Sequence, residues 1–363
     1  MNLLHTEASK GWGGQEIRIL REAIGMRERG FHVFIAVASG AILAKKARDA
    51  GFQVYEIPLE IKKGFVALPK LISIIRKHNI DIVHTHSSAD AWLGGIAARL
   101  TKTKVIRTRH LSTPIKPGWN SYLLYNFLAN KVITTCESVS KILQKQAHLS
   151  PLRCKSIPTG IDPSVMKVKK QLIEDFKKKY GLQPDQFIIG TVCVLRSWKG
   201  ISTLLQAAKL SPPHFKWLIV GDGPSSEKYE QQMRSLGLEN QVIFTGYLED
   251  PLPAVEAMDV FALLSEANEG VSQASLQAAF LKKPLITTTI GGLSEVCLDG
   301  ITGYHISNPQ QVLEASLKFY ENPDQRKTFG EAAHQLVLDH FTFDKTIEDT
   351  VAMIRDCLPS SNS

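Results

Sequence analysis

The densest set of residues that could do chemistry lies in segment 268–278, directly after an apolar, strand-like run at 260–264. Glu269 stands near the start of this segment and Gln277 near its end. The residues that follow Glu269 are Gly270, Val271, Ser272 and Gln273. Because a helix N-terminus favours an anion, these four backbone amides are predicted to bind phosphate, with Glu269 and Gln277 on hydroxyl groups at either side. An ordinary helix start with a Glu in its first turn is the alternative.

A pair of cations follows another strand-like run, at 187–194. Arg196 and Lys199 stand at the carboxyl end of this run, beside Gly200. Two fixed cations at the mouth of a strand–helix unit could bind a diphosphate without any metal ion. Solvated surface cations are the alternative, but ligands of α/β proteins collect at the carboxyl ends of strands, which favours the functional interpretation.

Gly13 and Gly14 precede a helical pattern and could let backbone amides approach a ligand closely. A dinucleotide-binding fingerprint requires Gly-x-Gly-x-x-Gly and an acidic residue closing the second strand. This chain has Ser39 and Gly40 after that strand, which argues against a nicotinamide cofactor. A simple tight turn is the alternative for the two glycines.

Three histidines lie at strand ends: His84 and His86 flank one residue at the end of one strand, and His110 follows another. Two histidines at alternate positions suggest a metal, but no carboxylate or thiol accompanies them at ligand spacing. Hydrogen-bonded or core histidines are therefore the favoured interpretation of His84 and His86. No Asp-x-Asp sequence is present to hold a metal–diphosphate complex, and we predict no metal site.

These residues need a scaffold, and the chain alternates strand-like and helix-like segments throughout. The strand predictions are 32–38, 53–57, 80–84, 104–108 and 131–135, then 187–194, 216–220, 241–245, 260–264 and 284–288. Such alternation is typical of an α/β fold with parallel sheets covered by helices. The 363 residues are enough for two Rossmann-like domains with a ligand cleft between them, and 44% of them are hydrophobic. No apolar run reaches the ~18–20 residues of a membrane-spanning helix.

Charge is distributed unevenly along the chain. Residues 1–165 hold 24 Lys and Arg against 11 Asp and Glu, whereas residues 166–363 hold 19 against 24. A basic first half indicates an anionic partner there, although solvated charges remain an alternative. No zinc-finger spacing or RNP-like strand supports nucleic acid as that partner. Five cysteines, none in a Cys-x-x-Cys pair, argue against disulfides and for a reducing, cytoplasmic location.

Several short motifs, in order along nearly the whole chain, resemble those of the family 4 glycosyltransferases. The motifs are Gly13-Gly14, Ile157–Asp162, Arg196 with Lys199, Gly221-Asp222-Gly223, Phe244-x-Gly246, the Glu269 segment, Gly291-Gly292-x-x-Glu295 and Asp299-Gly300-x-Thr302-Gly303. The resemblance implies a GT-B fold of two facing Rossmann-like domains and transfer of a sugar with retained anomeric configuration. It implies an N-terminal acceptor domain at 1–165, a nucleotide-sugar domain at 166–340, and a C-terminal helix at 341–363 that crosses back and ends in a frayed tail.

The resemblance also implies roles for individual residues. Arg196 and Lys199 would bind the diphosphate, and Glu269, the first acid of the family's Glu, seven residues, Glu motif, would contact the donor sugar. His110 matches the family's histidine near the transferred sugar, and Gly13 with Gly14 would line the first-domain side of the cleft. The donor would be a UDP-, ADP- or GDP-sugar, with no further cofactor. Gln277 replaces the family's second Glu; it could still accept a ribose hydrogen bond but could not act as a carboxylate.

Relatives that glycosylate lipids suggest peripheral association with an anionic membrane, and a glycan or glycolipid acceptor such as lipopolysaccharide core. Aromatic and basic residues suited to a bilayer interface form two groups: Lys62, Lys63, Phe65, Val66, Leu68 and Lys70, and Lys116, Trp119, Tyr122 and Tyr125. A nucleotide-sugar epimerase and a non-catalytic nucleotide-sugar binding protein are the rival functions. The sequence leaves the oligomeric state open.

Overall fold

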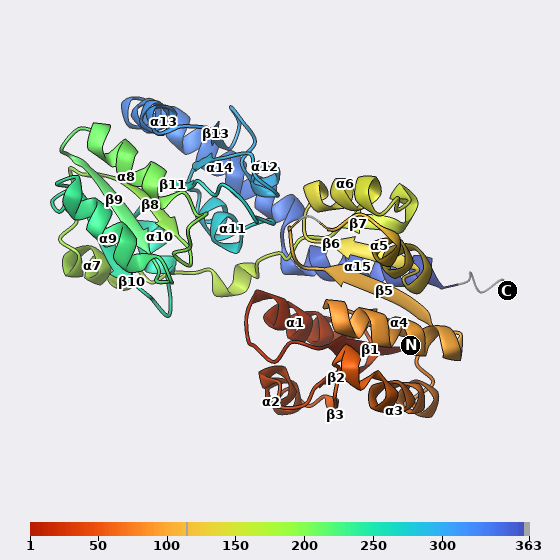
Figure 1. Ribbon diagram of the computed structural model, residues 1–363. Helices are drawn as coiled ribbons and strands as arrows, with labels where there is room; N and C mark the ends of the chain where they lie inside the picture. Colours follow the sequence, from red (N-terminus) through yellow and green to blue (C-terminus); the bar gives the residue numbers. More distant parts are fainter. Residues whose placement is uncertain (114, 359–363) are drawn as a thin grey trace. The chain divides into compact units, whose positions relative to one another are not determined.

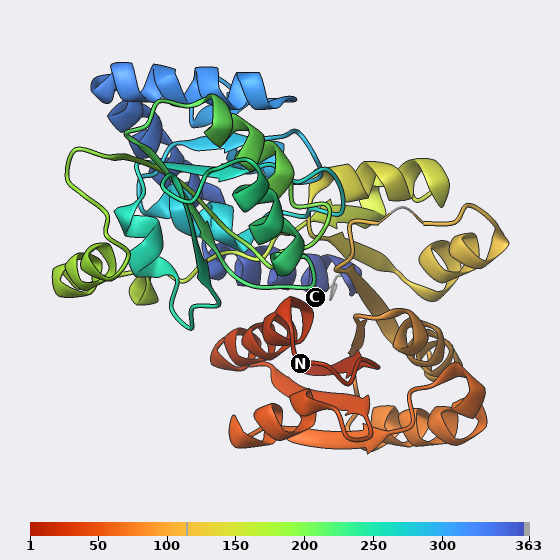
Figure 2. The ribbon, with the colours of Figure 1, turned by 60° about the vertical axis from the view of Figure 1, so that its left-hand side comes forward.

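The structure is a computed structural model that describes residues 1–113 and 115–358, and it consists of two compact units (Figures 1 and 2). The first unit comprises Met1–Thr159 and the described residues from Asp344 onward, and the second is Gly160–Phe343. Residues 160–165 therefore belong to the second unit and not, as expected, to the first. The reason is local: Ile161 pairs with Thr342, and a Cβ at Gly160 would lie only 2.2 Å from the Thr342 backbone.

A seven-stranded parallel sheet forms the first unit, with the strand order β3-β2-β1-β4-β5-β6-β7. The strands are β1 (Asn2–Glu7), β2 (His32–Ala38), β3 (Gln53–Ile57), β4 (Ile82–Thr85), β5 (Lys104–Arg109), β6 (Lys131–Thr134) and β7 (Cys154–Ser156). The sequence patterns did not predict β1 or β7. The strand order reverses between β1 and β4, and ligands of doubly wound sheets bind beside such a reversal at the carboxyl ends of the strands.

Helices cover both faces of this sheet. They are α1 (Gly14–Glu28), α2 (Ile42–Asp49), α3 (Gly64–Lys77), α4 (Ser88–Thr101), α5 (Trp119–Tyr122), α6 (Glu137–Gln146) and α15 (Phe343–Cys357). The last helix packs on α1, where Gly25 leaves room for the Ile347 side chain: a Cβ at Gly25 would lie 2.8 Å from it. At the sheet edge Lys155 pairs with Asp349 at 3.0 Å, so the C-terminal helix belongs to the first unit's fold.

The second unit has a six-stranded parallel sheet with the order β10-β9-β8-β11-β12-β13. Its strands are β8 (Phe187–Val192), β9 (Phe215–Val220), β10 (Val242–Gly246), β11 (Val260–Leu263), β12 (Leu285–Thr287) and β13 (Gly303–His305). Its helices are α7 (Lys170–Lys179), α8 (Ile201–Leu210), α9 (Ser226–Ser235), α10 (Leu252–Ala257), α11 (Gln273–Phe280), α12 (Leu293–Val296), α13 (Pro309–Glu321) and α14 (Pro323–His340). One apolar core lies on each face of the sheet, and the strand order reverses between β8 and β11. The predicted α/β class with two parallel sheets is confirmed.

Candidate functional site

The loops after β8 and β11 bring together two residues that the sequence singled out separately. Lys199 forms a short ion pair with Glu269 Oε1, and Ser265 Oγ donates a hydrogen bond of 2.8 Å to the same oxygen. Glu269 is buried, with 6% of its surface exposed. The pair lies at the carboxyl ends of adjacent strands where the strand order reverses, which is the position expected for a ligand site.

Glycines hold the backbone around this pair in place. Gly200 has a φ of +68°, and a Cβ there would lie 2.0 Å from the Leu264 carbonyl oxygen. Gly291 has a φ of +63°, and a Cβ there would lie 1.7 Å from the carbonyl oxygen of Glu269 itself. Only glycine fits either position, because the backbone conformation and the close approach both exclude a side chain. Gly291 belongs to a motif that the sequence analysis noted, but its packing against Glu269 was not foreseen.

Arg196 lies in the same loop as Lys199 but is exposed. Its guanidinium lies over the Trp198 ring, 5.3 Å from the centroid, and its carbonyl oxygen accepts a hydrogen bond of 3.2 Å from the Tyr229 hydroxyl. The side chain forms no ion pair with any residue that the structure describes. Its charge is thus available to an anionic ligand, whereas its backbone is fixed.

The helix after Glu269 begins later than the sequence suggested. Of the four amides predicted at its N-terminus, only that of Gln273 belongs to α11; Gly270 and Val271 lie in the loop. Ser272 is the N-cap, and its hydroxyl accepts a hydrogen bond of 3.3 Å from the Ser275 amide. The Ser272 cap thus fixes the start of α11, while Asn268 upstream has a left-handed φ of +57°.

Gln277 is half-buried in α11, four residues after Gln273. Residues with this spacing share one helix face, so both glutamines follow the loop that holds Glu269. The structure places Gln277 in the second turn of α11, and its grouping with the preceding amides stays a prediction.

In the first unit, Gly13 is the N-cap of α1, with an extended backbone, and its amide donates a hydrogen bond of 2.8 Å to Glu16. Neither Gly13 nor Gly14 has a positive φ, and a Cβ at Gly14 would meet no atom within 4 Å. The backbone conformation therefore does not require glycine at either position, and a turn with negative φ values is still an alternative. They leave open space above the helix N-terminus, at the carboxyl end of β1.

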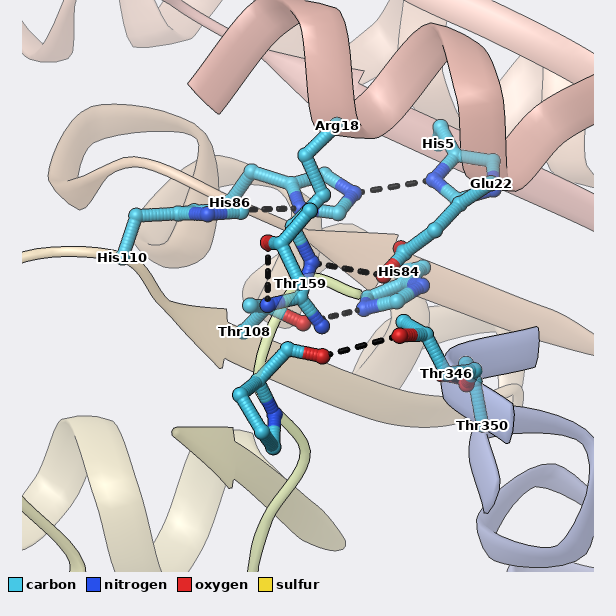
Figure 3. A network of polar contacts seen from close by, with 11 residues as sticks. His5, Arg18, Glu22, His84, His86, Thr108, His110, Thr159, Thr346 and Thr350 are labelled. Carbon is cyan, nitrogen blue, oxygen red and sulfur yellow. Dashed lines mark hydrogen bonds and ion pairs between the residues drawn. The ribbon is translucent and has the colours of Figure 1, made fainter. Parts of the chain in front are cut away.

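A chain of hydrogen-bonded histidines runs through the first unit (Figure 3). His5 Nδ1 lies 2.8 Å from His86 Nε2, and His86 Nδ1 lies 3.0 Å from His110 Nε2. His84 lies beside them and bonds the Thr108 hydroxyl at 2.7 Å. His84 and His86 are thus buried and hydrogen-bonded, as the sequence analysis favoured. His5 was missed because its strand, β1, was missed.

These histidines are held in the neutral state. Burial, and then the charge of His84, lowers the pKa of His5 to about 3, and burial followed by the charge of Arg18 does the same for His84. Burial also lowers the pKa of His86 and His110 well below the usual value, and Arg18 contributes to both shifts. Arg18 itself is buried in an ion pair of 2.7 Å with Glu22 (Figure 3). His110 can therefore accept or donate a hydrogen bond but does not supply a fixed positive charge.

Three of the histidines could hold a metal ion. The ligand atoms of His5, His84 and His86 lie within 4.8 Å of one another, and a neutral imidazole is the form that binds metals. However, His5 Nδ1 and His86 Nε2 already share a hydrogen bond of 2.8 Å, as expected for hydrogen-bonded core histidines.

Comparisons with known proteins agree on one family across the two units. The family model described as "Glycosyltransferase Family 4" matches residues 12–165, and that described as "Glycosyl transferases group 1" matches residues 173–336. A solved glycosyltransferase from Rickettsia africae superposes with a TM-score of 0.90 at 24% identity, over 99% of both chains. The HepE protein of Anabaena in complex with UDP superposes with a TM-score of 0.86 at 22% identity, over 99% of this chain and 100% of HepE. Both likenesses show the GT-B fold.

Sequence relatives point the same way. The N-acetyl-alpha-D-glucosaminyl L-malate synthase of Bacillus anthracis is 26% identical over 304 residues, which cover 80% of this chain and 78% of the relative. The UDP-Gal:alpha-D-GlcNAc-diphosphoundecaprenol alpha-1,3-galactosyltransferase of Escherichia coli is 30% identical over 256 residues, 64% of each chain. Together with the parallel sheets and the paired Lys199 and Glu269, these matches lead to one conclusion: the chain is a glycosyltransferase and belongs to family 4.

Proposed function

We propose that this enzyme transfers a sugar from a nucleotide-diphosphate sugar to a hydroxyl group of a lipid-linked glycan, with retained configuration and without a metal ion. The observation that carries the proposal is the buried Lys199–Glu269 pair at the carboxyl ends of β8 and β11. The Anabaena neighbour in complex with UDP supports the donor class, and the Escherichia coli relative, named for a diphosphoundecaprenol acceptor, supports the acceptor class. The relatives favour transfer over epimerisation.

Catalysis would depend on charge that develops at the donor. When the sugar leaves, negative charge builds on the diphosphate, and fixed cations stabilise this charge most where water is excluded. Lys199 can turn from Glu269 to the diphosphate, and exposed Arg196 can reach it from the same loop. The amides of residues 270–273 would add neutral donors. Two cations and these amides can supply the stabilisation that a divalent ion supplies in other transferases.

Glu269 and Gln277 would orient the two ends of the donor. The carboxylate of Glu269 accepts hydrogen bonds and is held by Ser265 even when Lys199 turns to the diphosphate, so it can receive the hydroxyl groups of the sugar without first being ordered. The amide of Gln277 can accept one hydrogen bond from a ribose hydroxyl. Its neutrality means that Gln277 contributes binding and not charge.

The first unit would bind the acceptor. Gly13, Gly14 and His110 lie after β1 and β5, at the carboxyl edge of that sheet. His110 bonds His86 through Nε2, so Nδ1 is the nitrogen left to meet an acceptor hydroxyl. Because His110 is neutral, it can accept a hydrogen bond from that hydroxyl or donate one to it.

Incubation with UDP-, ADP- and GDP-sugars, with and without a bacterial lipid-linked glycan extract, tests this function. We expect radiolabelled sugar to enter the lipid fraction in the presence of EDTA, and NMR of the product to show retained configuration. Conversion of the donor alone would indicate an epimerase, and binding without turnover would indicate a binding protein. Either result would contradict the proposed transfer, and loss of transfer in EDTA would contradict metal independence.

An exposed apolar and basic patch supports membrane association. Its apolar members are Ile61, Phe65, Trp119 and Tyr122, exposed by 60%, 79%, 72% and 41%, and its cations are Lys62, Lys63 and Lys116. A groove of about 560 Å³ is lined by Phe65 from one segment and Asn120 from the other, which makes the two predicted groups neighbours. Tyr125 is not part of the patch, because it is buried under Arg107 and Arg109. No helix among the described residues is long and apolar enough to cross a bilayer.

Flotation with vesicles of phosphatidylglycerol and phosphatidylcholine tests this association. We expect the protein to float with the anionic vesicles at low salt and to be released at high salt, because salt screens the lysines. Phe65→Ser and Trp119→Ser should each weaken flotation several-fold. Leu152→Ser is the matched control, since Leu152 is 86% exposed in the same unit but lies outside the patch. Equal flotation of all three variants would contradict membrane binding through this patch.

A further inference from the structure

The first unit contains a pocket of about 260 Å³ at the carboxyl ends of its central strands. Its wall includes Ser87 and Ser88 at the start of α4, and Arg107, Arg109 and His110 at the end of β5. Lys116 adds a third cation, and none of the described residues that line the pocket is acidic. The wall of the pocket therefore carries positive charge that no acidic side chain of the wall balances.

Arg107 is the least satisfied residue of this wall. It is only 5% exposed, yet its Nε and Nη1 atoms have no hydrogen-bond partner among residues 1–113 and 115–358. Arg109 likewise has a buried Nε without a partner in this part of the chain. Burying a charged donor without a partner is costly, so an acceptor beyond the described side chains, such as a water molecule or a ligand oxygen that enters the pocket, would stabilise these nitrogens.

The neighbouring carboxylates do not fill this need, because their oxygens are already occupied. Asp90 Oδ2 accepts hydrogen bonds from Thr6 Oγ1 at 2.9 Å and the His86 amide at 2.8 Å, and Asp90 Oδ1 accepts from the Ser87 amide at 2.8 Å. Glu7 accepts from the Ser9 amide at 2.6 Å and from the side chain of Gln15. Arg107 acts on Asp90 only through space, where its charge counteracts the rise of the Asp90 pKa that burial causes.

The two guanidinium groups are also held in position. Arg107 lies over the Tyr125 ring, 4.7 Å from the centroid, while Arg109 Nη1 donates to the Tyr125 hydroxyl at 3.0 Å and Arg109 Nη2 donates to the Thr113 carbonyl at 2.5 Å. Both cations are thus oriented before any ligand arrives, which lowers the entropic cost of binding. Planar guanidinium groups match the oxygens of phosphate. Three cations also offer more hydrogen-bond donors than a carboxylate ligand, with its two oxygens, could accept.

We infer that this pocket is a subsite for a phosphate group of the acceptor. The inference rests on the proposed function, because it assumes that the first unit binds the acceptor. Phosphate oxygens would meet Arg107, Arg109 and Lys116, and the adjoining sugar would lie toward His110. The acceptor would then be a phosphorylated saccharide, whether a free sugar phosphate or a lipid-linked one.

Titration with glucose 1-phosphate, followed by phosphorus NMR, tests the subsite. Saturating UDP is added to occupy the nucleotide site of the second unit, and methyl glucoside serves as an uncharged competitor. We expect glucose 1-phosphate to bind, and we expect methyl glucoside not to displace it. Arg107→Gln and Arg109→Gln should each weaken binding about 10–100-fold, the range for a hydrogen bond to a charged group. Lys45→Gln is the control, because Lys45 is exposed on α2 and lies outside the pocket wall.

Three outcomes would overturn the inference. Absence of binding, or equal binding by the Arg109→Gln variant, would show that the pocket does not bind phosphate. Inorganic phosphate bound as tightly as glucose 1-phosphate would indicate a general anion site without a role for the sugar. UDP binding is measured alongside, in the unchanged protein and in the Arg109→Gln variant. If the unchanged protein binds glucose 1-phosphate but no UDP, the donor proposal fails and the subsite remains.

Discussion

Lys199→Ala is expected to reduce turnover about 10²–10³-fold, the loss typical of removing one group that stabilises developing charge. Lys199 is the cation nearest to the buried carboxylate at the proposed donor site, with 17% of its side chain exposed. The expected loss is in kcat more than in KM, because the diphosphate carries most negative charge after the sugar has begun to leave. Single-turnover assays with saturating donor measure it directly. Lys327→Ala, which removes an exposed lysine of α14 in the same unit, should keep normal turnover.

Loss of folding must be separated from loss of chemistry, because Lys199→Ala also leaves Glu269 buried without its charged partner. Uncompensated buried charge is destabilising. The double variant Lys199→Ala with Glu269→Gln removes both charges and should regain much of the thermal stability without regaining turnover. Near-normal turnover in Lys199→Ala or in Glu269→Gln would show that these residues do not have the roles proposed here.

Acidification is expected to unfold the first unit far more readily than the second. His5, His84, His86 and His110 have lowered pKa values in the folded unit, so the unfolded chain binds more protons below pH ~6.5. Each histidine then costs about 1.4 kcal/mol of stability per pH unit. Glu7 acts in the opposite direction. Burial, followed by the charge of Asp90, raises its pKa to about 7, so the folded unit binds one proton there that the unfolded chain does not bind. Because an unfolded histidine is only half protonated at pH 6.5, the net loss is about 3 kcal/mol between pH 6.5 and pH 5.5.

Pulse proteolysis in urea at pH 7.5, 6.5 and 5.5, with the surviving fragments identified by mass spectrometry, measures this loss for each unit. Stability should be full above pH ~7.5 and fall as the pH decreases through the unfolded histidine pKa of about 6.5. His5→Gln should reduce the slope by about one proton. His148→Asn removes an exposed histidine of the same unit and should leave the slope unchanged. A first unit whose stability does not change over this range would contradict the buried, neutral histidine cluster.

The sequence patterns predicted most elements that are apolar runs or helix-like segments, such as β2 and α1, and the α/β class followed from them. They missed β1 because its residues His5, Thr6 and Glu7 are polar and yet fully buried. His5 and Thr6 are hydrogen-bonded to His86 in the loop after β4 and to Asp90 of α4, more than 75 residues away. A strand stabilised inside by distant polar partners has no periodic apolar pattern that could reveal it.

The candidate site could be predicted as a set of residues but not as an arrangement. Arg196, Lys199 and Glu269 were recognisable because each follows a strand and stands near a glycine. That Lys199 and Glu269 pair depends on β8 lying next to β11, which is a property of strand order. The burial of Tyr125 depends on two arginines of β5. Neither contact is local in sequence, whereas the later start of α11 goes with a local cap at Ser272.

A crystal structure with the nucleotide diphosphate identified by the donor assay tests the central claim most directly. The account predicts diphosphate oxygens within hydrogen-bond distance, ~2.7–3.2 Å, of Lys199 Nζ and of at least one amide among residues 270–273. Lys199 should have turned from Glu269, leaving that carboxylate free to meet the sugar. A diphosphate bound elsewhere on the chain, with Lys199 still paired to Glu269, would contradict the account.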